Sequence, residues 1–345
     1  MQQGQIKDRI GRCMFKKLHI VYATDSRYLF PTKVAASSAV AWASRKEDLV
    51  IDILDCGLGD DEWNSFSSSI LLRLGDDYSL VRHKINMAVY DNMQAWHTSK
   101  GAYARLELPQ ILGDVDWCIY ADGDTLFTDD PFKLMEFFDE SYALLGHRDA
   151  PGANQAEWHA RHGLPWVEQS RVCSGFLVMN LTWFRENRGV EKLFEFLKDY
   201  PDVLFPDQDA LNVVCNGKIG LLPEQWGEFT FWVNRVTKPG CFHYAGRPPW
   251  VAPSRQNKIP MTSTRRIWFY TLEKICGIKP WKCEGYSWFS YYCEIIKSYF
   301  FVFVFSVLNV IPGMRGRYDG VFNDWWPHSK MHKFMIKRLS GYVRV

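Results

Sequence analysis

Short apolar runs alternate with segments of helical periodicity along the first third of the chain. The runs at residues 18–23 (LHIVYA) and 49–54 (LVIDIL) are typical of buried strands, and residues 33–43 and 63–74 have the spacing of helices. A further apolar run at residues 117–121 (WCIYA) ends directly in acidic residues. Strands that alternate with helices predict an α/β fold, in which a sheet lies between helical layers.

The alternation continues into the second half of the chain. Helical spacing returns at residues 100–112, after Pro131 and at residues 190–197, and strands are predicted at 142–145 and 176–181. No internal repeat is present.

Residues 149–171 interrupt this pattern, because they are polar, contain several Gly and Pro residues and show no clean period. Loops of that length in a compact domain are usually functional or mobile. We therefore expect a functional loop here.

Composition divides the chain into unlike regions. With 47% hydrophobic and 23% charged residues, the chain is neither disordered nor collagen-like, and 345 residues suffice for one large core with an appendage. Residues 265–345 hold 13 of the 41 Lys and Arg residues, 5 of the 39 Asp and Glu residues and 20 of the 54 aromatic residues. We expect an extension at 1–17, a main domain at 18–264 and a basic, aromatic-rich region at 265–345. The acidic main domain and the lack of a recognisable motif disfavour nucleic-acid binding.

The basic region contains one membrane-like run, at residues 299–311 (YFFVFVFSVLNVI). As a helix it would cover about 20 Å, short of the roughly 30 Å hydrocarbon core, so it should not span a membrane. Basic and aromatic residues surround it: Lys297, Arg315, Arg317, Trp325, Trp326, Lys330, Lys333, Lys337 and Arg338. This setting favours peripheral attachment to an anionic membrane surface, and the alternative is a buried element of the globular domain.

The N-terminal segment and the cysteines indicate the cytoplasm. Residues 1–17 are polar and basic and lack the apolar core of a secretory signal. The nine cysteines are odd in number and contain no Cys-x-x-Cys pair, which is typical of free thiols in a reducing compartment. We therefore expect a location on the cytoplasmic face of the membrane.

Asp122-Gly123-Asp124 is the first candidate for chemistry, because it follows the strand at 117–121 and ligands of open α/β sheets bind at the carboxyl ends of strands. Two carboxylates at this spacing can hold a divalent cation that neutralises a diphosphate, and the alternative is a solvated turn. An EF-hand loop is excluded because Leu126 and Phe127 stand where an oxygen ligand and a glycine are needed. The Asp-x-Asp-x-Thr motif of haloacid-dehalogenase phosphatases is excluded because the threonine stands at 125 rather than 126.

Two later segments carry further candidates. Residues 205–212 (FPDQDALN) combine carboxylates and an amide at a helix start, where they could orient sugar hydroxyls or stabilise a developing cation; the alternative is helix capping by Asp207. In residues 242–250 (FHYAGRPPW), His243 offers a metal-binding nitrogen, Gly246 permits close backbone approach and Arg247 offers a phosphate fork. The alternative for His243 is a structural role.

Together these segments resemble glycosyltransferase family 8, whose retaining enzymes have the GT-A fold and include bacterial lipopolysaccharide galactosyl- and glucosyltransferases. The order of motifs across residues 18–250 matches that of the family. The resemblance implies a metal site at Asp122, Asp124 and His243 and catalytic roles for Asp207 and Gln208. It implies nucleotide-sugar binding by Ala23, Thr24, Asp25, Tyr28, Arg105, Asp122, Gly123, Cys173, Ser174, Gly246 and Arg247.

Three positions depart from the family pattern or match it only with a gap. Cys173-Ser174 replaces the usual Asn-Ala before a glycine, and Pro248 stands where the family has Lys, so Arg247 is expected to take over the diphosphate contact. Asp149 is expected to bind acceptor or sugar, although its alignment needs a gap.

The resemblance implies a retaining, metal-dependent enzyme that moves galactose or glucose from a UDP-hexose to a glycan. We expect Mn²⁺, with Mg²⁺ as an alternative, because imidazole suits softer metals. A lipid-linked acceptor, above all lipopolysaccharide core, fits the basic region best. The alternatives are a soluble glycan or protein acceptor, or a sugar-nucleotide-binding module without turnover.

Overall fold

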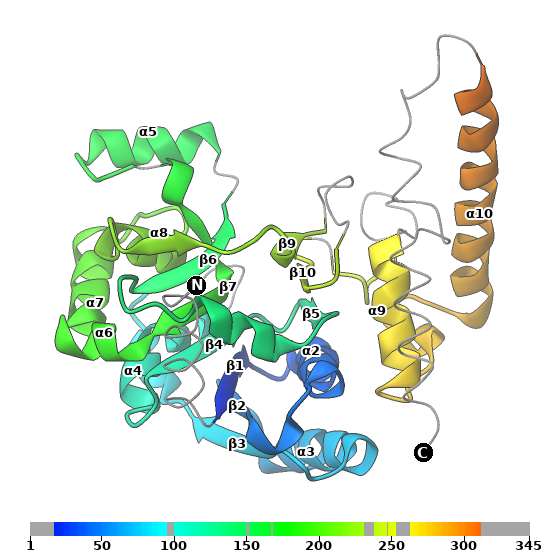
Figure 1. Ribbon diagram of the computed structural model, residues 1–345, viewed down its shortest axis with the longest axis horizontal. Coiled ribbons are helices and arrows are strands. Elements are labelled where there is room, and N and C mark those ends of the chain that lie inside the picture. The colour runs from blue at the N-terminus through cyan, green and yellow to red at the C-terminus, as the bar shows by residue number, and fades with distance from the viewer. Residues whose placement is uncertain are drawn as a thin grey trace, which may run out of the picture.

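The computed structural model describes residues 17–94, 100–149, 152–166, 168–230, 238–246, 248–252 and 263–311 (Figure 1). Its centre is a seven-stranded sheet of order β3-β2-β1-β4-β7-β6-β8. The strands are β1 (Leu18–Thr24), β2 (Leu49–Asp55), β3 (Ser79–Lys84), β4 (Trp117–Ala121), β6 (Leu144–Arg148), β7 (Val172–Asn180) and β8 (Ile219–Leu221). β7 runs antiparallel to β4 and β6, and the other pairs are parallel. The expected α/β architecture is confirmed as a mixed sheet flanked by helices.

Helices cover both faces of this sheet. The α-helices of the described residues are α2 (Leu29–Trp42), α3 (Asp60–Leu74), α4 (Leu108–Ile111), α5 (Ala153–Arg161), α6 (Leu181–Glu186), α7 (Gly189–Asp199), α8 (Pro206–Val214), α9 (Ser263–Lys274) and α10 (Trp288–Val310), and α10 stands away from the sheet (Figure 1). Alternate residues of β1 enter different cores, since Ile20 and Tyr22 pack with the side chains of α2 and α9 whereas Val21 packs with those of α6, α7 and α8. This two-sided burial is why the strands read as continuous apolar runs.

Several elements differ from the expectation. Residues 101–107 and 131–137 form 3₁₀ helices rather than α-helices, and the strand expected at 142–145 lies at Leu144–Arg148. The segment 149–171, expected to be a loop, contains α5. β3 was missed because this edge strand is half-exposed and reads SLVRHK, without an apolar run.

A second, three-stranded sheet lies beside the main one and brings two distant segments together. It consists of β5 (Thr125–Phe127), β10 (Cys241–His243) and β9 (Trp226–Phe229), in the order β5-β10-β9. β5 begins directly after Asp124 and pairs antiparallel with β10, so that His243 lies opposite Thr125. Tyr244 also donates its backbone N–H to the Asp124 carbonyl at 2.9 Å. This pairing places His243 beside the acidic turn.

The C-terminal region begins inside the core. The expected boundary between residues 264 and 265 falls in α9, where Trp268, Phe269 and Leu272 are fully buried in the same core as β1 and α2. α10 follows and stands at the edge of the molecule (Figure 1). Most of the run at 299–311 belongs to α10, and its Phe300 and Phe303 are exposed rather than buried in the globular domain.

In the described part of the chain, no helix is both long and apolar enough to cross a membrane. Residues 312–345, with the basic positions from Arg315 to Arg338, lie outside the described residues. The eight described cysteines are free thiols, and seven of them are buried.

A buried carboxylate connects the first three strands of the sheet. Asp52 on β2 accepts hydrogen bonds from His19 Nδ1 on β1 and from His83 Nε2 on β3, each at 2.8 Å. Burial alone would raise the pKa of Asp52, but the hydrogen bonds and charges of the two histidines outweigh it, so that the pKa lies below its usual value. The ionised form is therefore stabilised by folding.

The Asp52→Asn variant should lower the free energy of unfolding by about 2 kcal/mol near pH 7, because it removes a buried charged acceptor from two partly buried donors. A carboxylate whose pKa is depressed contributes stability above its unfolded pKa, about 4, and this contribution is lost as the pH falls through the folded pKa. The gap between wild type and variant, measured by urea unfolding from pH 7 to pH 3, should therefore narrow below about pH 4. A gap that stays constant over this range would contradict the assignment.

Candidate active site

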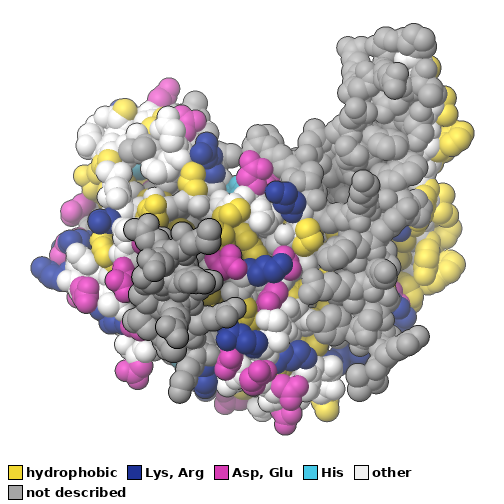
Figure 2. Space-filling model, in the orientation of Figure 1, with side chains coloured by type: hydrophobic (Ala, Val, Ile, Leu, Met, Phe, Trp, Pro, Cys, Tyr) yellow, Lys and Arg dark blue, Asp and Glu magenta, His cyan; other side chains and the backbone are white. Residues whose placement is uncertain are grey.

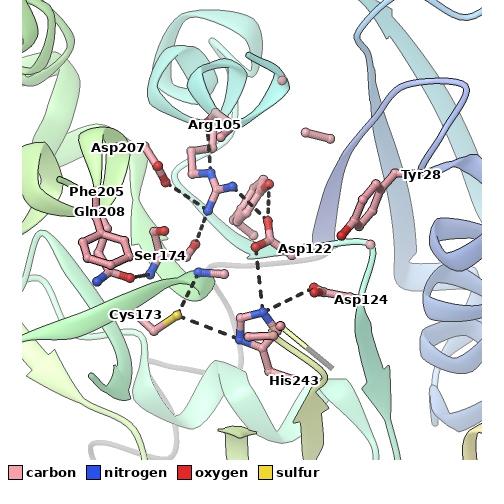
Figure 3. Close-up of a pocket in the computed structure, with 18 of the residues that line it drawn as sticks. Tyr28, Arg105, Asp122, Asp124, Cys173, Ser174, Phe205, Asp207, Gln208 and His243 are labelled. Carbon is pink, nitrogen blue, oxygen red and sulfur yellow. Dashed lines mark hydrogen bonds and ion pairs between the residues drawn. The ribbon is translucent and has the colours of Figure 1, made fainter. Parts of the chain in front are cut away.

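A cavity of about 680 Å³ opens at the carboxyl ends of β1 and β4. Residues from eight separate segments of the chain line it. Figure 3 shows several of them around the cavity. Among them are Ala23, Thr24, Asp25, Tyr28, Arg105, Asp122, Gly123, Asp124, Asp149, Cys173, Ser174, Asp207, Gln208, His243 and Gly246. All the candidate site residues from the sequence thus line this one cavity, except Arg247, which lies outside the described residues. Their individual roles in binding and catalysis stay predictions.

Asp122, Asp124 and His243 form the candidate metal site. His243 Nε2 lies 3.9 Å from Asp122 Oδ2 and 3.3 Å from Asp124 Oδ1, and one ligand atom from each residue lies within 4.8 Å of the others. Burial opposes a charge on His243, but the neighbouring Asp124 carboxylate prevails and raises the pKa of His243 well above its usual value. Burial also disfavours the charged form of Asp122 and therefore raises the pKa of this carboxyl, although the positive charge of Arg105 opposes that shift. The three side chains thus form a candidate site for a divalent cation.

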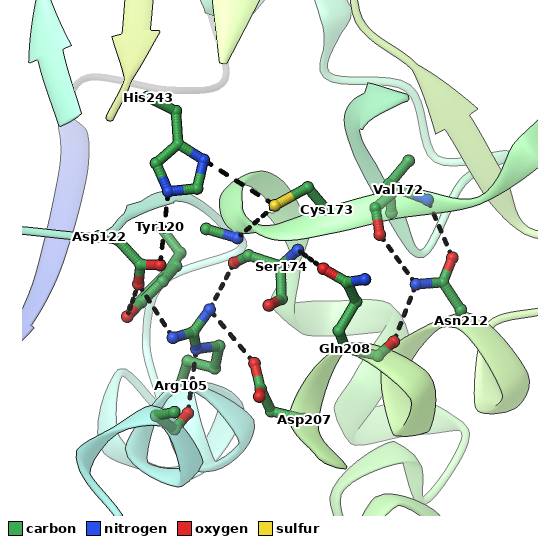
Figure 4. A network of polar contacts seen from close by, with 12 residues as sticks. Arg105, Tyr120, Asp122, Val172, Cys173, Ser174, Asp207, Gln208, Asn212 and His243 are labelled. Atoms are coloured by element: carbon green, nitrogen blue, oxygen red, sulfur yellow. Dashed lines mark hydrogen bonds and ion pairs between the residues drawn. The ribbon is translucent and has the colours of Figure 1, made fainter. Parts of the chain in front are cut away.

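The neighbours of His243 determine which ring nitrogen faces the carboxylates. Its Nδ1 lies 3.9 Å from Cys173 Sγ (Figure 4). Its ring stacks on Phe229 with centroids 5.4 Å apart. Nε2 therefore points toward Asp122 and Asp124. A Cβ at Gly175 would lie 2.3 Å from His243 Cε1 and 2.6 Å from Asp122 Oδ2, so only glycine fits between them.

Arg105 connects the metal site to the start of α8. The side chain is only 4% exposed and donates hydrogen bonds to Asp122 Oδ1 at 2.9 Å and to the Ser174 carbonyl at 2.6 Å. Its Nη1 also lies 3.3 Å from Asp207 Oδ2. Burial disfavours its charge, yet Asp122 above all holds the pKa of Arg105 above its usual value. A permanent positive charge therefore lies between a metal-site carboxylate and a candidate catalytic carboxylate.

The first turn of α8 presents its polar side chains in two directions. Asp207 points toward Arg105, whereas Asp209 Oδ2 accepts the Phe205 N–H at 3.1 Å across the helix start. The alternative in which Asp207 caps the helix is therefore wrong, because Asp209 binds the helix-start N–H. Pro206 occupies the first turn, where a missing N–H costs nothing.

The Gln208 amide is held at both ends. Its Oε1 accepts the Ser174 N–H at 3.1 Å, and its Nε2 donates to Asp149 Oδ2 at 2.9 Å. Asn212, one turn later, exchanges hydrogen bonds of 2.9 Å with both backbone groups of Val172 (Figure 4). α8 is thereby fastened to β7, and the orientation of Gln208 is determined before any ligand arrives.

The departures at 173–174 have a physical explanation. Ser174 contacts Arg105 through its carbonyl and Gln208 through its N–H, so these contacts do not depend on its side chain. Several lining residues were not among the sequence candidates, and they include Tyr120, whose hydroxyl donates to Asp122 Oδ1 at 2.8 Å, Phe229 and Gln155. Tyr120 could have been found, since residues two apart on a strand share a face.

Comparisons with known proteins agree with this geometry. The family model described as "Glycosyl transferase family 8" matches residues 19–250. Glucoside xylosyltransferase 2 of Mus musculus is 27% identical over 219 residues, which are 57% of this chain and 48% of that protein. This chain thus spans about half the length of that curated relative.

Two solved structures share the fold. The bifunctional glycosyltransferase WbbM has a TM-score of 0.63 and 17% identity, over 78% of this chain and 51% of that one. The galactosyltransferase LgtC, solved in complex with donor and acceptor sugar analogs, has a TM-score of 0.57 and 22% identity, over 68% of this chain and 89% of that one. At these identities the likeness shows the fold alone, and it confirms the expected GT-A architecture.

Replacing Arg105 by Ala should lower the free energy of unfolding in EDTA by about 3 kcal/mol, because the buried Asp207 and the partly buried Asp122 would lose their cation. In a double-mutant cycle with Asp207→Asn, a coupling of about 1 kcal/mol or more is expected. The matched control is Arg27→Ala, which removes an exposed ion pair with Asp25 and should change stability by about 0.5 kcal/mol or less. Additive effects of Arg105→Ala and Asp207→Asn in urea unfolding would show that the two side chains do not interact.

Proposed function

Because the chain belongs to glycosyltransferase family 8, we propose that it transfers a hexose, galactose or glucose, from a UDP-sugar to a glycan acceptor with retention of the anomeric configuration. The observation that carries this proposal is the meeting of the Asp122-Asp124-His243 group, Arg105 and Gln208 around one cavity. These groups supply what transfer requires: charge stabilisation for a diphosphate and a polar group beside the anomeric carbon.

The donor set supports a divalent cation in this proposal. Asp124 Oδ1 is buried and accepts no hydrogen bond within the described residues, and its charged neighbour is His243 Nε2 at 3.3 Å. A cation between the two atoms would bind both of them. One imidazole nitrogen with two carboxylates favours Mn²⁺ over Mg²⁺. When bound between Asp122, Asp124 and His243, the ion would stabilise the negative charge of the departing UDP.

The turn at residues 23–28 is the proposed nucleotide end of the cavity. Asp25 Oδ1 accepts the backbone N–H groups of Arg27 and Tyr28, at 3.0 and 3.1 Å, and so holds the turn. Tyr28 remains 44% exposed at the mouth of the cavity, with an aromatic face available to a uracil ring. Ala23, Thr24, Gly123 and Gly246 would line the path of the ribose and diphosphate.

Gln208 and Asp207 are the proposed catalytic residues. An amide is a poor nucleophile, so Gln208 is assigned to stabilising an oxocarbenium-like state rather than to forming a covalent bond. Asp207, held toward the cavity by Arg105, is assigned to orienting a hydroxyl of the donor sugar. Arg105 would balance the charge that develops on the diphosphate, and Cys173 and Ser174 would contact the donor sugar.

We propose a hexose as the donor sugar. Because the similar proteins include both a galactosyltransferase and a xylosyltransferase, the assay has to compare hexose and xylose donors. The proposed acceptor is a lipid-linked glycan such as lipopolysaccharide core. A soluble glycan or protein acceptor and a binding module without turnover are the alternatives, and the assays below separate them.

The proposal of a membrane partner rests on the exposed apolar residues of α10. Its exposed large apolar residues recur every three or four positions and therefore share one face. They are between 39% and 72% exposed: Trp288, Phe289, Tyr292, Ile296, Tyr299, Phe300, Phe303, Val307 and, after the helix, Ile311. Figure 2 shows this apolar surface along the right edge of the molecule. The residues after 311 carry seven Lys and Arg residues against two Asp residues, which complements anionic lipid. We therefore propose that α10 lies in the interface of an anionic membrane, on the cytoplasmic face.

Purified protein in Mn²⁺ should release UDP from either UDP-galactose or UDP-glucose but not from UDP-xylose, faster with lipopolysaccharide-core oligosaccharide and not at all in EDTA. Asp124→Ala should abolish release.

Gly175→Ala should lower the rate of UDP release at least about tenfold because its Cβ meets His243 and Asp122, a disturbance of about 1.4 kcal/mol or more. Gly113→Ala is the control, since Gly113 does not line the cavity and its added Cβ would meet only the Gln110 carbonyl, at an ordinary contact distance of 3.8 Å. Near-wild-type release by Asp124→Ala would refute the metal site, and preference for UDP-xylose would refute the hexose assignment.

The triple variant Phe289→Ser, Phe300→Ser, Phe303→Ser should bind vesicles of phosphatidylglycerol and phosphatidylcholine at least about tenfold more weakly than wild type, because each burial contributes about 1.5–3 kcal/mol. Co-sedimentation measures this. Leu72→Ser with Val89→Ser, which removes exposed apolar residues elsewhere, should bind like wild type. Deletion of residues 265–345 is unsuitable because it removes core residues of α9. Equal binding by wild type and the triple variant would exclude the α10 face.

A further inference from the structure

Gln155 is a polar side chain of the cavity that the proposed reaction does not use. It lies in the first turns of α5 and lines the cavity, although it is only 3% exposed. Its Nε2 has no hydrogen-bond partner within the part of the chain that the structure describes. By contrast, the amide of Gln208 is paired at both ends. Leaving a buried donor unpaired costs about 1–3 kcal/mol, so a group outside the chain is the expected partner.

α5 holds Gln155 in place rather than leaving it free to turn away. His159, one turn later on the same face, is fully buried and its Nε2 lies 3.1 Å from Asp209 Oδ1. The same Asp209 oxygen accepts a hydrogen bond of 2.6 Å from Arg171. Trp158 Nε1 donates a hydrogen bond to Asp202 Oδ2 at 3.3 Å, and its ring lies edge-on to Tyr200, which anchors the helix to the segment after α7. α5 is therefore fastened to the first turn of α8, where Gln208 is located.

The position along the cavity indicates which ligand Gln155 would meet. Phe205 and Gln208 lie on the opposite side of the cavity from Tyr28 and Asp124 (Figure 3). Gln155 belongs to the Gln208 side, since α5 follows Asp149, which is bonded to Gln208, and Gly152 and Asp149 line the cavity with it. A UDP-sugar whose uracil lies at Tyr28 and whose diphosphate lies at the Asp122-Asp124-His243 group would place its sugar at Gln208. The space beyond, beside α5, then remains for the second substrate.

We infer that Gln155 is an acceptor-recognition residue, whose amide donates a hydrogen bond to a hydroxyl of the acceptor glycan beside the Gln208–Asp149 pair. Phe205, half-buried in the same wall, offers an aromatic face for the apolar side of a pyranose ring. A neutral amide suits a neutral hydroxyl, and the ligand class is thus an uncharged hexopyranoside rather than a phosphate or a carboxylate. This inference rests on the proposed function, because it assumes that the nucleotide occupies the Tyr28 end.

The test measures sugar binding directly and does not require turnover. Methyl β-D-galactopyranoside, methyl β-D-glucopyranoside and lipopolysaccharide-core oligosaccharide are added to full-length protein saturated with UDP in Mg²⁺, which is diamagnetic. Saturation-transfer NMR reports the bound sugar, and calorimetry reports the UDP affinity. The variants are Gln155→Met, which keeps the volume and removes both amide groups, and Gln155→Glu, which removes the donor. Asn154→Ala, at the preceding exposed position, is the matched control.

Wild type and Asn154→Ala should bind at least one probe, and both Gln155 variants should bind it at least fivefold more weakly with UDP affinity unchanged. Gln155→Met should be as stable as wild type or more stable in urea, because it removes an unpaired buried donor. Equal sugar binding by wild type and Gln155→Met overturns the inference, as does tighter binding by Gln155→Glu, which would make the amide an acceptor.

Two further outcomes separate the inference from the proposed function. A fall in affinity for intact UDP-hexose, but not for UDP, in Gln155→Met would move the contact to the donor sugar and overturn the acceptor assignment. Wild type that binds UDP but none of the probes also overturns it and leaves the nucleotide site intact. Wild type that binds no UDP at all refutes the proposed function itself.

Discussion

The buried guanidinium of Arg105 is the interaction on which the rest of the site depends. Three carboxylates, Asp122, Asp124 and Asp207, converge on one cavity, and repulsion among them would oppose folding. Arg105 contacts two of the three and also binds the Ser174 carbonyl, so it joins η3 (Gly101–Glu107), the acidic turn, β7 and α8. The planar fork of arginine reaches all three partners at once, which the point charge of a lysine could not do.

A second constraint is the pairing of β5 with β10. It joins residues more than one hundred positions apart and places the imidazole of His243 over the carboxylates. Cys173 and Phe229 then determine the ring orientation, and glycine at 175 leaves the space that the ring occupies. His243 lies on β10, and Asp122 and Asp124 lie in the short turn that β4 and β5 hold at both ends. The strands thus position the three candidate ligands, which reduces the reorganisation needed to bind a cation.

Local patterns predicted most of the fold, because buried strands such as β1, β2 and β4 are apolar on both faces. The acidic turn was also predictable, since its chemistry lies in three consecutive residues. His243 was identified through resemblance, because only β5–β10 pairing brings it to Asp124. The polar edge strand β3 and helix α5 carried no apolar period, so Gln155 had no signal in the sequence. The sequence could not show which of Asp207 and Asp209 binds the helix-start N–H and which faces the cavity. That depends on where Arg105 and Arg171 lie.

The burial of α9 has a consequence for biosynthesis. Trp268 and Leu272 complete the core that β1 and α2 begin at the other end of the chain, so the core cannot close until α9 has left the ribosome. At about 5–20 residues per second, α10 follows within seconds. The nascent chain therefore exposes the apolar face of α10 at nearly the same moment as its core becomes complete, which leaves little time for that face to find another surface before the domain is folded.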